Sequence, residues 1–281
     1  MNKTAIDWCD VTWNPVTGCK KGCPYCYARN QATRFGGWTC GGGWTCAEDK
    51  TTENRTGKEP PELDYPLYVR RKSGKEVVAP FPFGFEPTMH RYRLDSPARM
   101  KEGKNIFVCS MADLFGMWVP LCWIREVMDA CLAAPQHNYL FLTKFPERYK
   151  SLDYVSLLPR ADNFWYGTTV TNLNELHRID MLPEAAHRFV SIEPIMGPID
   201  MDLAGQSVDW IIVGAETGNR RKKSKSSPHI DWLRGLHGYA LRNGIPILFK
   251  DSKELKAVWG PDRELIQQFP DGLRKGVEVH G

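Results

Sequence analysis

The sequence lacks the features of a membrane or exported protein. Its 281 residues contain no apolar run of about eighteen residues, the length that a membrane-spanning helix needs. The N-terminal stretch MNKTAIDWCDVTW has no apolar segment after its lysine and does not read as a signal peptide. We therefore expect a single globular domain over residues 1–281, in the cytoplasm and with no membrane partner.

The chain also has little excess charge of either sign. Its net charge is +4, so composition alone neither requires nor excludes a nucleic-acid partner. Five of the six residues in Arg220–Lys225 are basic, and this stretch is a candidate contact for nucleic-acid phosphates. A solvated surface loop is the alternative.

Cysteine, in contrast, is plentiful. There are nine cysteines, an odd number in a chain without an export signal, so we do not expect a disulfide framework. In a reducing compartment, clustered cysteines more often bind metal or do redox chemistry. Cys122 and Cys131 stand among apolar residues and are expected to be small buried hydrophobes.

Short apolar runs alternate with helix-like stretches from about residue 104. This alternation predicts a parallel βα repeat. The expected strands are 105–109, 139–143, 164–170, 188–192, 210–213 and 245–249. The expected helices are 121–134, 172–181 with an Asn172 cap, and 231–243 ending at Gly244.

Two more strands, 11–16 and one ending near 86–90, bring the expected number to eight. The predicted fold class is therefore α/β, a (β/α)8 or partial TIM-type barrel, with an open doubly wound sheet as the alternative. Residues 31–80 interrupt the pattern and are read as a loop or small subdomain inserted after the first strand. Its Trp38 and Trp44 could stack on bases, and its Cys40 and Cys46 could bind a further metal.

The clearest chemical signal is a group of three closely spaced thiols. Cys19, Cys23 and Cys26 have the spacing C-x3-C-x2-C. Three such ligands can hold three irons of a [4Fe–4S] cluster and leave the fourth iron open to a small molecule. Structural zinc is the competing interpretation, but it needs four ligands, and only Cys23 and Cys26 have the usual C-x2-C spacing.

The same motif, C-x3-C-x-aromatic-C with Tyr25 as the aromatic residue, resembles that of the radical S-adenosylmethionine superfamily. The resemblance implies that S-adenosylmethionine chelates the open iron and is cleaved by an electron from the cluster. The resulting 5′-deoxyadenosyl radical then abstracts hydrogen from a substrate. It also implies a full or partial (β/α) barrel with the cysteine loop after the first strand.

A closer resemblance covers most of the chain. The segments WNPVTGC, CPYCYA, FVCSMADLFG, FLTKFPERY, WYGTTVTN, RFVSIEPIMGPID and DWIIVGAETG occur in this order. Together they resemble a phage-type Gp37/Gp68-like family of unknown function (DUF5131-like), which is similar to the spore photoproduct lyase branch of the superfamily. That branch repairs a thymine dimer in DNA. Members of the family are often encoded with a small cysteine-motif partner protein.

Polar residues at the ends of the expected strands are the candidate cofactor ligands. Since functional residues of a barrel lie at the C-terminal ends of its strands, these side chains are expected to share one pocket. The resemblance to photoproduct lyases implies that Ser110, Lys144 and Thr168 hold S-adenosylmethionine, with Lys144 on its carboxylate. Ser191 and Glu193 would lie near the adenosine or the substrate. A solvated lysine, salt bridges and caps are the structural alternatives.

Cys109 directly precedes Ser110, as a hydrogen-donating cysteine does in photoproduct lyases. The resemblance therefore makes Cys109 the candidate catalytic residue, with a buried strand cysteine as the alternative. Taken together, the sequence predicts a radical enzyme that acts on a nucleic-acid base or nucleotide and needs an electron donor. A radical enzyme acting on a peptide or small metabolite, and a zinc-stabilised nucleic-acid-binding protein without enzymatic activity, are the two competing hypotheses.

Overall fold

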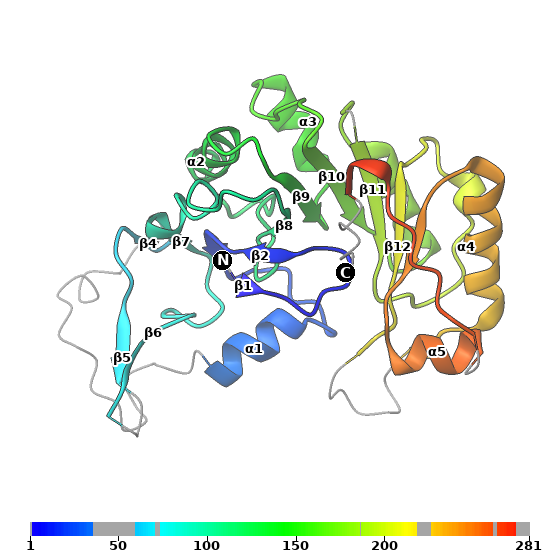
Figure 1. Ribbon diagram of the computed structural model, residues 1–281, viewed down its shortest axis with the longest axis horizontal. Helices are drawn as coiled ribbons and strands as arrows, with labels where there is room; N and C mark the ends of the chain where they lie inside the picture. Colours follow the sequence, from blue (N-terminus) through cyan, green and yellow to red (C-terminus); the bar gives the residue numbers. More distant parts are fainter. Residues whose placement is uncertain are drawn as a thin grey trace, which may run out of the picture.

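The computed structural model describes residues 2–35, 60–70, 74–185, 187–217, 226–260 and 263–273. Its main feature is an eight-strand sheet in the order β1-β2-β8-β9-β10-β11-β12-β13 (Figure 1). The strands are β1 (Asn2–Lys3), β2 (Val11–Trp13), β8 (Asn105–Val108), β9 (Asn138–Thr143), β10 (Phe164–Thr169), β11 (His187–Ile192), β12 (Trp210–Val213) and β13 (Ile247–Phe249). All neighbours pair in parallel except β1, which runs antiparallel to β2.

The seven parallel strands form a half-barrel. In the described part of the chain the two edge strands, β1 and β13, do not pair with each other. The α/β class is therefore confirmed. The segment expected as an eighth barrel strand is β7 (Thr88–His90), which lies in a separate small sheet between β3 (Val16–Thr17) and β4 (Glu62–Leu63).

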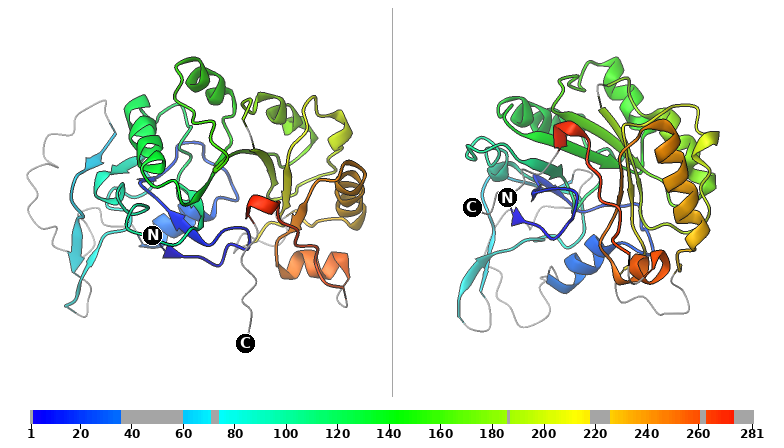
Figure 2. Two further views of the ribbon diagram at one scale, coloured as in Figure 1. Left: turned by 45° about the horizontal axis from the view of Figure 1, so that its top comes forward. Right: turned by 45° about the vertical axis from the view of Figure 1, so that its right-hand side comes forward.

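Helices α2, α3 and α4 cover the outer face of the half-barrel (Figure 2). The α-helices are α1 (Tyr27–Phe35), α2 (Leu121–Leu132), α3 (Glu147–Tyr154), α4 (Ile230–Asn243) and α5 (Lys253–Trp259). The 3-10 helices are η1 (Arg91–Arg93), η2 (Leu173–Met181), η3 (Met201–Leu203) and η5 (Asp271–Leu273). Within the described residues, no helix has the length and apolar character that a bilayer crossing demands.

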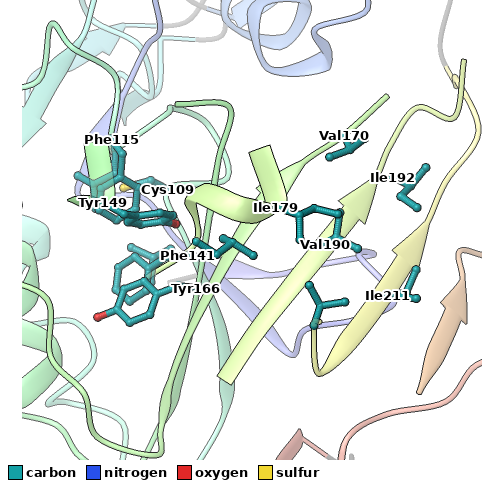
Figure 3. Close-up of a cluster of buried hydrophobic side chains, with 14 of the residues drawn as sticks. Cys109, Phe115, Phe141, Tyr149, Tyr166, Val170, Ile179, Val190, Ile192 and Ile211 are labelled. Carbon is teal, nitrogen blue, oxygen red and sulfur yellow. The ribbon is translucent and has the colours of Figure 1, made fainter. Parts of the chain in front are cut away.

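Two separate hydrophobic clusters lie on the two faces of the sheet, because successive strand residues point in opposite directions. The larger, outer cluster joins the strands to α2 and α4 and includes Phe141, Tyr166 and Ile211 (Figure 3). The inner cluster is mainly aromatic and contains Trp8, Phe107, Trp165, Phe189 and Trp210. Burial on both faces explains why the strands read as nearly continuous apolar runs.

The inserted region is described only in part. After α1 the structure describes β4 and a hairpin of β5 (Tyr68–Arg70) and β6 (Glu76–Val78), which lies at the margin of the molecule (Figures 1 and 2). Glu62 connects β4 to η1 and α2, because its carboxylate accepts hydrogen bonds from Arg91 and Trp123. The predictions for Trp38, Cys40, Trp44 and Cys46 lie outside the described residues.

Gly167 in β10 is required by the inner cluster. A Cβ atom at this position would lie 2.5 Å from the ring of Phe189. Gly167→Ala should therefore destabilise the fold by about 1–3 kcal/mol through overpacking, measured by urea unfolding. The matched control is Gly235→Ala in the middle of α4, where a Cβ meets nothing within 4 Å and alanine favours the helix. Equal stability of the two variants would contradict this packing.

Candidate functional site

The cysteine loop, residues 18–26, is held between two other segments. On one side, the Gly18 N–H donates to the Met111 carbonyl at 2.9 Å, and Gly18 pairs in parallel with Ala112. On the other side, the Cys19 N–H donates to the Phe85 carbonyl at 3.1 Å. Gly18 has a φ of +87°, and a Cβ there would lie 2.3 Å from the carbonyl oxygen of Glu86. Only glycine fits at this point, so the loop has a fixed path beside the end of β8.

The three thiols of this loop are close enough to influence one another electrostatically. Burial raises the pKa of the Cys19 thiol to about 11, and nearby negative charges add to this shift: Asp113, Cys26 and Cys23. Backbone N–H groups point at two of the sulfurs, from Lys21 to Cys19 at 3.5 Å and from Arg29 to Cys26 at 3.3 Å. Such N–H groups stabilise a thiolate once a metal has displaced its proton.

The cysteine loop offers three thiol donors. Among the described residues, no three His, Cys, Asp or Glu side chains are placed to hold one metal ion together. A single zinc ion needs its donors to converge on one point at about 2.3 Å. In a cubane cluster, each thiolate binds a different iron, so the sulfurs stay further apart. Three thiols in one loop are the donor type that such a cluster takes.

A polar row crosses the inner face of the sheet beside this loop. The Lys144 ammonium, just after β9, lies 3.3 Å from Thr169 Oγ1 at the end of β10 and 6.0 Å from the centre of the Tyr25 ring. Thr169 is in register with Ser191 of β11, whose buried hydroxyl has no hydrogen-bond partner among the described residues. In the part of the chain that the structure describes, Lys144 has no ion-pair partner. Its charge also acts electrostatically on the buried Asp113 carboxyl, where burial raises the pKa and Lys144 lowers it.

A second polar group lies at the ends of β11 and β13. Lys250 donates to the Glu193 carboxylate, and both side chains are partly exposed. Gly214 makes room for this pair, because a Cβ there would lie 2.9 Å from the Glu193 side chain. The Tyr27 hydroxyl donates to the Ser110 carbonyl at 2.8 Å. Although Tyr27 is 50% exposed, desolvation of its hydroxyl and the charge of Glu193 raise the pKa of Tyr27. Tyr27 thus connects the cysteine loop to this group.

Comparison with known proteins adds one finding. A family model described as "Protein of unknown function (DUF5131)" matches residues 3–264. The chain belongs to the DUF5131 family. No curated protein and no solved structure matches it.

Most of the predicted site residues of this DUF5131 chain lie along the same edge of the sheet, although not all point inward. Ser110 lies at the site, where its hydroxyl donates to the Asn14 side chain at 3.2 Å. Thr168 points to the outer face and donates to the Thr143 carbonyl at 3.0 Å. Its neighbour Thr169 occupies the inner position next to Lys144. The sequence reasoning missed Thr169 and also Tyr27, although Tyr27 directly follows the last cysteine of the motif.

Cys109 is not brought together with these residues. Its thiol is buried in the outer hydrophobic cluster, near Phe115, Phe141 and Tyr149 (Figure 3). Its backbone has a φ of +59°, which interrupts the alternation of side chains between the two faces of the sheet. Cys131 is buried as predicted, whereas Cys122 is exposed, so that prediction is wrong. The stretch Arg220–Lys225 lies outside the described residues.

The two cysteines Cys109 and Cys122 should differ sharply in reactivity. Burial raises the pKa of the Cys109 thiol to about 12, so almost no reactive thiolate exists at neutral pH. In native protein, iodoacetamide should therefore label Cys122 and leave Cys109 intact, as measured by peptide mass spectrometry. Unfolding in urea should expose both thiols. Rapid labelling of Cys109 in the native state would show that its thiol is accessible.

Proposed function

We propose that this chain is a radical S-adenosylmethionine enzyme built on a partial TIM-type barrel. In this proposal, Cys19, Cys23 and Cys26 hold a [4Fe–4S] cluster. The observation that carries it is the position of the three-thiol loop, which lies at the same sheet edge as Lys144 and its polar neighbours. When bound, the cluster and S-adenosylmethionine together supply reductive cleavage of a sulfonium, which yields a 5′-deoxyadenosyl radical.

The inner polar row would bind the methionine part of S-adenosylmethionine. Lys144 would supply a positive charge for the carboxylate, with its ammonium donating to Thr169. The centre of the Tyr25 ring lies 6.0 Å from the Lys144 ammonium, so Tyr25 would border the same region. The buried Ser191 hydroxyl has no partner within the described ranges, and a ligand oxygen would satisfy its donor. Ser110 contributes mainly through its carbonyl, which fixes Tyr27.

The substrate would lie against the second polar group. Glu193 and Lys250 offer a hydrogen-bond acceptor and a donor side by side. Such a pair can form hydrogen bonds with the edge of a polar ring or with an amide. We propose a nucleic-acid base or nucleotide as the substrate class, with Arg220–Lys225 as the phosphate contact. A peptide or small metabolite remains the alternative substrate. The proposal further includes a cytoplasmic location, a separate electron donor and a small cysteine-motif partner protein.

One anaerobic assay tests this function. Protein purified under argon, reduced and given S-adenosylmethionine should release 5′-deoxyadenosine, detected by mass spectrometry. Deuterated DNA or RNA should pass deuterium into that product if a nucleic acid is the substrate. A colourless protein with stoichiometric zinc and no 5′-deoxyadenosine would overturn the proposal. Cleavage without deuterium transfer would leave the radical chemistry intact but exclude the nucleic acids tested.

A further inference from the structure

Helix α1 begins directly after the third cysteine of the loop. The Asn30 N–H donates to the Cys26 carbonyl at 3.4 Å, which places Cys26 at the N-cap position of the helix. The first N–H groups of a helix have no partner within it. The Arg29 N–H is one of these groups, and it donates to Cys26 Sγ at 3.3 Å. The backbone of Arg29 is thus bound to the last thiol of the motif.

The side chain of Arg29 reaches back to the first cysteine. Helical side chains lean toward the N-terminus of their helix, which for Arg29 is the direction of the cysteine loop. The Arg29 Nη2 donates to the Cys19 carbonyl at 2.9 Å, although Arg29 lies ten positions further along the chain. One residue therefore contacts both the first and the third cysteine, through its side chain and its backbone respectively.

Phe85 holds the same guanidinium from outside the loop. The Arg29 Cζ lies 4.9 Å from the centre of the Phe85 ring, within the range of a cation–π contact. The Phe85 carbonyl also accepts from the Cys19 N–H at 3.1 Å. Both backbone polar groups of Cys19 are therefore bound, the N–H by Phe85 and the carbonyl by Arg29.

Lys20 belongs to the same loop but has a weaker kind of contact. Its ammonium lies 2.7 Å from the Glu86 carboxylate, and the two side chains are 51% and 48% exposed. Exposed ion pairs contribute little to stability, because water screens the charges and both side chains lose freedom. Lys20 therefore provides a comparison in which a positive charge of the loop is removed without loss of the Arg29 contacts.

We propose that Arg29 is a positioning residue that holds the first and third cysteines of the loop in place before a metal cluster binds. Ordering a free loop costs conformational entropy, and a loop that is already fixed avoids this cost when its ligand binds. The inference rests on the proposed function for the presence of the cluster. The contacts that carry it are formed by the chain itself, so they can be tested separately.

The first test is amide hydrogen exchange of residues 18–26 in the metal-free protein. Arg29→Met keeps an unbranched apolar side chain that suits a helix but removes the guanidinium. Exchange in the loop should become about 10-fold faster, the factor that corresponds to one lost hydrogen bond of a charged group. Arg29→Lys keeps a cation and one possible donor, so its rate should lie between those of the wild type and Arg29→Met. Lys20→Met should match the wild type.

The second test is the rate at which the cluster-loaded protein loses iron to a chelator, followed by the decrease in visible absorption. Loss should be about 10-fold faster in Arg29→Met, intermediate in Arg29→Lys and unchanged in Lys20→Met. Circular dichroism should show that all variants unfold at nearly the wild-type temperature. A general loss of stability would shift that temperature, and it would not be partly reversed by lysine at this one position.

Each outcome decides between specific claims. Unchanged loop exchange in Arg29→Met, or equally fast exchange in Lys20→Met, overturns the positioning role. Faster exchange with unchanged iron loss overturns its importance for the cluster. A lysine variant as fast as the methionine variant contradicts a polar contact. A wild type that binds no cluster, in which Arg29→Met still loosens the loop, would overturn the proposed function and leave the Arg29 contacts standing.

Discussion

Replacing Cys19, Cys23 and Cys26 together by alanine is expected to abolish cluster binding and all 5′-deoxyadenosine formation. The three thiols are the only cysteines of the loop, and the bordering contacts of Gly18 and Cys19 hold it through backbone atoms that alanine retains. The fold should therefore survive while iron and sulfide are lost. Iron analysis, visible absorption and circular dichroism of the triple variant measure these effects separately.

Cys122→Ala is the matched control for the triple variant. Cys122 is exposed on α2, outside the cysteine loop, and its replacement should leave iron content and product formation unchanged. A triple alanine variant that still binds iron at the wild-type level would show that the metal lies elsewhere. Cys40 and Cys46 would then be the next candidates.

Loss of the Lys144 charge is expected to weaken binding of S-adenosylmethionine strongly. Lys144→Met keeps the length and packing of the side chain but removes its charge-assisted contact, which costs about 1.5–3 kcal/mol. That cost corresponds to a roughly 10- to 100-fold rise in Kd. Equilibrium dialysis on the cluster-loaded protein measures it. The bond from the Lys144 backbone N–H to Asp113 is retained in this variant, so the cluster itself should be preserved.

Lys150→Met provides the comparison for Lys144. Lys150 is an exposed residue of α3, and neutralising it changes the net charge by the same amount. Its Kd for S-adenosylmethionine should match that of the wild type. If Lys144→Met and Lys150→Met bind equally well, then Lys144 is a solvated lysine at a strand end and not a ligand contact.

The strands of the half-barrel could be predicted closely because each is a short apolar run buried on both faces. The runs at 139–143, 164–170 and 210–213 became β9, β10 and β12 with shifts of one residue at most. The run at 11–16 instead divides into β2 and β3, which belong to different sheets. Residues 86–90 became β7, outside the half-barrel. Apolar periodicity shows that a strand is buried but not which strand it pairs with.

Helix boundaries were predictable where a capping residue is present. Asn172 caps η2 by accepting from the Asn174 N–H, as its side chain predicts, although the segment winds as a 3-10 helix. Gly244 ends α4 with a φ of +64°, the left-handed conformation that glycine favours at this position. These signals are local, so they do not depend on the tertiary fold.

The site was only partly predictable because side-chain direction depends on local backbone geometry. The three cysteines can be identified from their spacing without knowledge of the fold. Which of Thr168 and Thr169 lies on the inner face of the sheet, however, depends on the orientation of strand β10. Cys109 has a φ of +59°, and its side chain lies in the outer hydrophobic cluster. The sequence does not predict this positive φ, because a left-handed backbone conformation is uncommon for cysteine.

The most direct test of the radical S-adenosylmethionine assignment is electron paramagnetic resonance of the anaerobically reduced protein, recorded before and after adding S-adenosylmethionine. An iron with no protein ligand should bind the added molecule, so the account predicts a [4Fe–4S] signal that changes on addition. A [4Fe–4S] signal that S-adenosylmethionine leaves unaltered, or a protein that contains zinc and gives no signal at all, would contradict it.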